Sequence, residues 1–126
     1  MVVTARVAEI FSDARDMHAA ALERLDAGDI RDAADKAWCA TKRASDALVL
    51  ARTGEEPELS PVTSRELRNL AGQDSRVEGL LPRYFTRQVM LHGECFYLGL
   101  CDPASITERR IRETADYIDD AEALSA

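Results

Sequence analysis

The sequence predicts an all-α protein, an antiparallel bundle of four long helices plus a short helix. Apolar residues recur at spacings of three and four over long stretches, and no segment keeps the alternation of a strand. Glycine, proline and capping residues divide the chain at a few points only. The 126 residues, 46% of them hydrophobic and 31% charged, suit one soluble domain with a single core, residues 1–126.

The first two predicted helices form a hairpin. The apolar spacing predicts one helix over residues 4–27 and another over residues 30–52. Gly28 ends the first, and the carboxylate of Asp29 can cap the unpaired amides of the second. So short a connection makes the two helices antiparallel. The contact face of the second helix is rich in alanine, which permits close approach, and Trp38 is expected to be a core anchor.

The middle of the chain predicts shorter elements. Thr63 and Glu66 have the spacing of a capping box, so a short third helix is expected over residues 64–70. Asp74 or Ser75 can open a fourth segment, because both side chains accept hydrogen bonds from the amides of a helix start.

One long helix is predicted over residues 82–100. Pro82 suits its first turn, because proline lacks the amide that a helix interior requires. Gly93 and Gly99 each weaken a helix, and we interpret them as sites of close contact with another helix. A second Ser-x-x-Glu capping box predicts a last helix over residues 105–123.

Charge and hydropathy restrict the class of protein. The net charge of −7 argues against a free-standing binder of duplex nucleic acid. Residues 60–93 carry five arginines against three acidic residues, so this zone could accept a phosphate or could simply be a mixed solvated surface. No apolar run approaches a membrane span and no signal peptide is recognised at the N-terminus, so a cytoplasmic location is expected.

The cysteines and known motifs suggest neither a metal nor a cofactor. Cys39, Cys95 and Cys101 form no CxxC pair, and we expect free, mostly buried thiols. The chain has no glycine-rich phosphate loop, no GxSxG elbow and no HExxH. His18 lies on or beside the apolar stripe of the first helix, which is typical of a packed, hydrogen-bonded histidine.

The candidate site is the stretch 87–97, where a cation and an imidazole share an apolar segment. Arg87 and His92 are five residues apart, about 140° around an α-helix, so they flank one broad face. Arginine could hold a phosphodiester, and histidine could take a proton from a ribose 2′-hydroxyl that attacks it. A second copy of the helix could complete the site.

The order of these features resembles a HEPN domain, a superfamily of small helical bundles. The resemblance rests on the hairpin 25–38, the segment 47–54, the Arg87-x4-His92 motif and the closing helix 112–118. It implies a homodimer that joins two copies of the motif helix. In active members the motif forms a metal-independent endoribonuclease site, often within toxin–antitoxin or other defence systems.

Carried onto this chain, the resemblance makes Arg87 the phosphate-binding residue and His92 the catalytic one. Arg83, Gln88 and Glu94 lie beside them on the same helix and are the candidate substrate-binding residues. Gln88 stands where members often have asparagine or another small polar group, and Glu94 stands where some members have tyrosine.

Two other functions fit the same residues. Many HEPN domains are non-catalytic partners, so the chain could be a helical binding module for a nucleotidyltransferase or an antitoxin. It could also be a purely structural bundle in which Arg87 pairs with Glu94.

Overall fold

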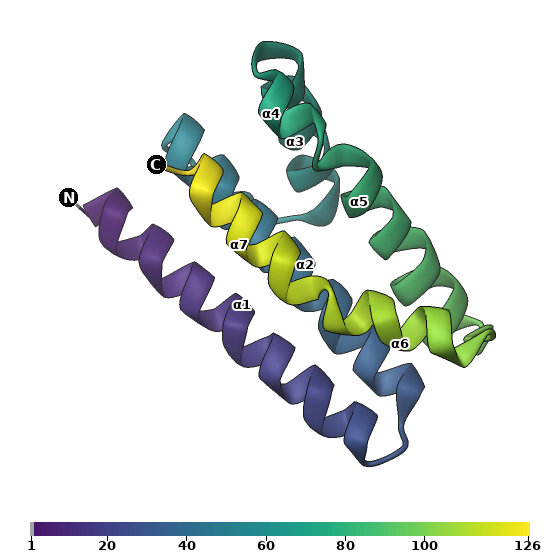
Figure 1. The fold of residues 1–126 in the computed structure, drawn as a ribbon. Coiled ribbons are helices and arrows are strands. Elements are labelled where there is room, and N and C mark those ends of the chain that lie inside the picture. The colour runs from purple at the N-terminus through teal and green to yellow at the C-terminus, as the bar shows by residue number, and fades with distance from the viewer. Residues whose placement is uncertain (1) are drawn as a thin grey trace.

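In the computed structural model, which describes residues 2–126, two long helices form an antiparallel hairpin (Figure 1). They are α1 (Val2–Asp26) and α2 (Ile30–Thr53). Gly28 connects them at φ +84°, and the side chain of Asp29 accepts a hydrogen bond from the Asp32 amide. The predicted hairpin and its cap are therefore confirmed.

The third helix begins earlier than the capping box predicted. α3 (Ser60–Gln73) has Pro61 in its first turn, which places Thr63 inside the helix. The Thr63 hydroxyl is buried and donates to the Asp46 carboxylate on α2 at 2.6 Å, so it caps nothing. Asp74 does open the short α4 (Ser75–Glu78), accepting from the Arg76 amide.

The predicted long helix over residues 82–100 is an α-helix that becomes a π-helix. α5 (Leu81–Thr86) carries Pro82 in its first turn, as expected, and continues into η1 (Arg87–Tyr97). A π-helix closes its hydrogen bonds over five residues instead of four and is rare at this length. The helix ends at Tyr97, three residues before the predicted end.

Neither glycine of this region packs against another helix as predicted. A Cβ built on Gly93 would meet only the Gln88 carbonyl of its own helix, at 3.7 Å. Gly99 lies beyond the helix at φ +74°, where it reverses the chain beside the guanidinium of Arg31. Glycine is thus required at position 99 because only glycine readily adopts a positive φ.

The predicted last helix is two helices that meet at Glu113. α6 (Ala104–Arg112) follows Pro103, and α7 (Thr114–Leu124) runs back along α2 (Figure 1). The second capping box is also wrong, because no side chain caps α6. The Thr107 hydroxyl of that box instead donates to the Cys101 carbonyl at 2.7 Å.

The core lies between the hairpin and the later helices, and no strand occurs within residues 2–126. Trp38 is buried as predicted and meets Tyr84 edge-on at 5.2 Å between ring centroids. No helix in this part of the chain is both long and apolar enough to span a membrane. The largest fully buried side chains are Ile10, Phe11, Leu48, Val49, Leu67, Val77, Leu80, Tyr84, Leu91, Ile111, Tyr117 and Ile118.

Two of the three cysteines are not free thiols. Cys95 and Cys101 form a disulfide, which corrects the prediction, and only Cys39 remains a thiol. The turn after η1 brings the two residues together, with their Cα atoms 4.2 Å apart. The sequence has no CxxC spacing that would indicate the Cys95–Cys101 pair, because the turn that joins them forms only when the chain folds.

Candidate functional site

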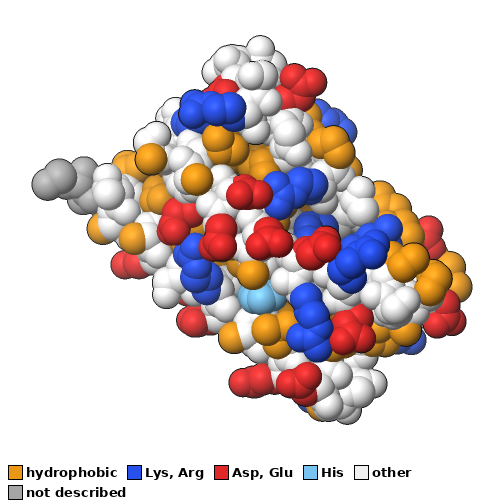
Figure 2. Space-filling model, in the orientation of Figure 1, with side chains coloured by type: hydrophobic (Ala, Val, Ile, Leu, Met, Phe, Trp, Pro, Cys, Tyr) orange, Lys and Arg blue, Asp and Glu red, His pale blue; other side chains and the backbone are white. Residues whose placement is uncertain are grey.

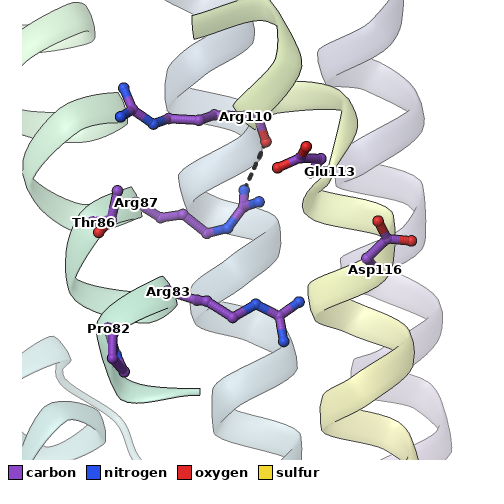
Figure 3. Close-up of a pocket in the computed structure, with 7 residues that line it drawn as sticks. All are labelled: Pro82, Arg83, Thr86, Arg87, Arg110, Glu113 and Asp116. Atoms are coloured by element: carbon purple, nitrogen blue, oxygen red, sulfur yellow. Dashed lines mark hydrogen bonds between the residues drawn. The ribbon is translucent and has the colours of Figure 1, made fainter. Parts of the chain in front are cut away.

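Arg87 is held inside the protein. It is the first residue of η1 and only 6% exposed. Its Nη1 donates to the Arg110 carbonyl at 2.9 Å (Figure 3) and also to the Thr114 hydroxyl at 2.6 Å. The guanidinium lies over the ring of Tyr117, 5.9 Å from its centroid. Arg87 therefore joins η1 to the junction of α6 and α7, and it forms no ion pair with Glu94 among residues 2–126.

Arg87 also lines a pocket of about 260 Å³, beside the part of its guanidinium that forms neither of these hydrogen bonds (Figure 3). Burial, and next the positive charge of Arg83, lower the pKa of Arg87 to about 10, so it stays a cation at neutral pH. Of the predicted substrate-binding residues only Arg83 lies here. The pocket is lined by Pro82, Arg83, Thr86, Arg87, Arg110, Glu113 and Asp116.

His92 faces a different part of the protein. Its side chain is 41% exposed, and its Nδ1 lies 3.2 Å from a carboxylate oxygen of Asp35 on α2. Phe96 stacks on the imidazole at 6.0 Å between ring centroids, and Trp38 lies at 6.2 Å. Asp35 was not anticipated, because 57 residues separate it from His92 and no local pattern joins them.

The pocket beside His92 is mostly apolar and has a volume of about 430 Å³. Gln88 and Glu94 line it, so two of the predicted substrate-binding residues accompany His92. Arg87 does not. Its hydrogen bonds draw it toward α6 and α7, whereas Asp35 draws His92 toward α2. In a single chain the predicted site is thus divided between two pockets.

Exposed apolar side chains lie on η1 and in the turn that follows it. We call Val89, Met90, Tyr97, Leu98 and Leu100 the η1 apolar patch, each at least 36% exposed. Figure 2 shows hydrophobic side chains at the right-hand end of the molecule, where Figure 1 draws the turn before α6.

The backbone beneath the patch is held in place from two sides. Arg31 donates to the carbonyl of Phe96 at 2.8 Å and to that of Tyr97 at 3.3 Å. The disulfide between Cys95 and Cys101 closes the same turn. The patch is therefore presented on a fixed backbone.

His18 is packed less completely than predicted. Its ring is partly buried, but Nε2 is shielded from solvent and has no hydrogen-bond partner. Burial lowers the pKa of His18, although the nearby carbonyls of Ile111 and Arg112 oppose the shift. The neutral imidazole is therefore the form that the fold favours.

No three His, Cys, Asp or Glu side chains within residues 2–126 are grouped so that they could hold a metal ion.

Comparisons with protein-family models, with curated proteins and with solved structures find no match to this chain.

Proposed function

We propose that this protein is a HEPN-like endoribonuclease that cuts RNA without a metal and uses His92 as the general base. The contact between His92 and Asp35, 3.2 Å long, is the observation that supports this proposal best. A carboxylate facing Nδ1 favours the tautomer that keeps the proton there, which leaves Nε2 free to accept one. It also stabilises the imidazolium that forms once Nε2 has taken a proton.

The proposed reaction is an internal attack within RNA. Nε2 removes the proton of a ribose 2′-hydroxyl, and the 2′-oxygen bonds to the adjacent phosphorus. The bond from phosphorus to the 5′-oxygen breaks, and that oxygen takes up a proton. The products are a 2′,3′-cyclic phosphate and a 5′-hydroxyl, so no other reactant is needed.

A homodimer belongs to the same proposal. The η1 apolar patch exposes Tyr97 by 72% and Leu98 by 63%, and grouped apolar side chains of this kind commonly mark an interface. Pairing two copies of η1 would cover the patch. The phosphate-binding role of Arg87 in cleavage remains a prediction, because Arg87 is buried in its own chain and lines the other pocket. We expect the double variant Tyr97→Ser/Leu98→Ser to sediment as a smaller species than the unmodified protein.

The decisive experiment measures cleavage of a single-stranded RNA in EDTA. His92→Ala should lower the rate by about 10²–10⁴-fold, the usual contribution of a general base. His18→Ala is the matched control, because it removes the other histidine, and it should leave the rate unchanged. Cleavage that survives His92→Ala, or that EDTA abolishes, would refute the proposal.

Asp35 has its own test, because a positioning residue should act only through His92. Asp35→Asn keeps the shape and removes the charge, so it should slow cleavage tenfold or more. The same substitution in the His92→Ala background should cause no further loss, because Asp35 acts through the imidazole. A further loss in that background would remove Asp35 from the mechanism.

The second candidate is a non-catalytic binding module for a nucleotidyltransferase or an antitoxin. The internal hydrogen bonds of Arg87 favour it, because a guanidinium already bound to Arg110 and Thr114 is less available to RNA. The η1 apolar patch would then hold the partner. A pull-down that returns only the protein itself would count against this function.

A further inference from the structure

The pocket beside Arg87 contains a buried positive charge that no carboxylate contacts. Arg87 is 6% exposed, and both of its hydrogen bonds go to neutral oxygens. No ion pair involves Arg87 anywhere in residues 2–126. Burying a charge is costly, so a buried guanidinium is normally paired with an anion. The anion that pairs with the Arg87 guanidinium is therefore expected to be a ligand, not a side chain of this protein.

The two acidic residues that line this pocket do not replace that anion. Glu113 favours the ionised form of Arg87, but its carboxylate is 53% exposed and lies 3.8 Å from Arg109. Asp116 forms no ion pair within the described part of the chain, and Figure 3 shows it on the far side of the pocket, on α7.

A second arginine, Arg83, adds positive charge beside Arg87. Arg83 and Arg87 are four residues apart and extend in the same direction toward α7 (Figure 3). Arg83 is partly neutralised by Asp120, at 2.7 Å, and the side chain of Arg110 extends the opposite way from those of Arg83 and Arg87 (Figure 3). Both Arg83 and Arg110 lower the pKa of Arg87, which is the repulsion that a bound anion would relieve.

Arg87 is positioned in advance for an oxyanion. Its Nη1 is occupied by two acceptors, so Nε and Nη2 form the edge that faces the pocket. This edge presents two parallel N–H groups, which match two oxygens of a phosphate. A volume of about 260 Å³ is below the usual range for drug-sized ligands, about 300–1,000 Å³, and so favours a small ligand.

We propose that this pocket binds a phosphate dianion through Arg83 and Arg87, either as free phosphate or as the end of a small phosphomonoester. The site is separate from the His92 pocket, which shares none of its lining residues. It does not depend on the proposed cleavage of RNA.

Isothermal titration calorimetry at constant ionic strength tests this site with two probes, inorganic phosphate and phenyl phosphate. We expect saturable binding of one molecule per chain. The variant Arg83→Gln should weaken it at least tenfold, because the Arg83 side chain lies beside that of Arg87 in the pocket. Arg112→Gln is the matched control, since Arg112 pairs with Glu108 and neither residue lines the pocket.

The two probes distinguish the sources of the phosphate. Binding of both identifies the dianion itself as the ligand, and binding of phenyl phosphate alone identifies a phosphomonoester. Failure of both probes to bind, or an equal loss in Arg112→Gln, would overturn the proposal. The proposal would also be overturned if an oligonucleotide bound while inorganic phosphate and phenyl phosphate did not. His92→Ala should bind phosphate normally, so the loss of cleavage and the loss of this site remain separate results.

Discussion

Replacing Tyr117 with phenylalanine tests the packing that supports the arginine pocket. Tyr117 is fully buried on α7, and its hydroxyl lies 2.6 Å from the Ser45 hydroxyl on α2. Ser45 donates its only hydrogen to the Thr41 carbonyl at 2.9 Å, so Tyr117 must be the donor between the two hydroxyls. Burial raises the pKa of Tyr117 well above its ordinary value, which keeps this donor protonated.

The magnitude follows from what the substitution removes. Tyr117→Phe keeps the ring and its contacts but deletes one neutral, buried hydrogen bond, which contributes about 0.5–1.5 kcal/mol. Ser45 keeps its own bond to Thr41, so only one lone pair is left unpaired. We expect the free energy of unfolding to fall by about 1 kcal/mol. For a chain of this size that lowers the midpoint temperature by about 3–6 °C.

Urea unfolding followed by circular dichroism measures this change, at one protein concentration because a dimer's stability depends on it. A double-mutant cycle with Ser45→Ala should give a coupling energy of about 0.5–1.5 kcal/mol. Additive effects of the two substitutions would refute the assigned hydrogen bond. Tyr117→Phe should still bind phosphate, because the ring beneath Arg87 is retained.

Three further predictions concern stability. Because the pKa of His18 is lowered in the fold, the unfolded chain binds the proton first, and the free energy of unfolding should fall as pH decreases below the ordinary histidine pKa of about 6.5. His18→Gln should remove that slope in urea titrations at several pH values, and an unchanged slope would contradict the assignment. Gly99→Ala should destabilise by about 1 kcal/mol or more, since φ is +74° and the new Cβ would press on Arg31 at 3.4 Å. A thermal melt that matches the unmodified protein would count against this strain. Leu91→Ala should cost about 2–5 kcal/mol in the same measurement, because Leu91 is fully buried on η1, and a loss below 1 kcal/mol would show that η1 packs loosely.

The sequence by itself determined the all-helical class and the first hairpin. Apolar residues at helical spacing must turn inward, and that rule acts within a few residues. Gly28, Asp29 and Pro82 are equally local, because each acts through its own backbone or through amides one turn away. These features were predicted correctly for that reason. Arg87 and His92 could be chosen as candidates, since their chemistry depends on residue type.

Only the tertiary structure decided what those side chains contact. Asp35 contacts His92 although 57 residues separate them in the sequence. The hydrogen bond to Thr114 holds the Arg87 guanidinium outside the His92 pocket. Thr63 has the sequence context of a helix cap, yet it is buried against the Asp46 carboxylate on another helix. Hydrogen bonds between distant elements depend on how those elements pack, and helical periodicity carries no information about the partner. The division of the predicted site into two pockets is therefore a result of packing.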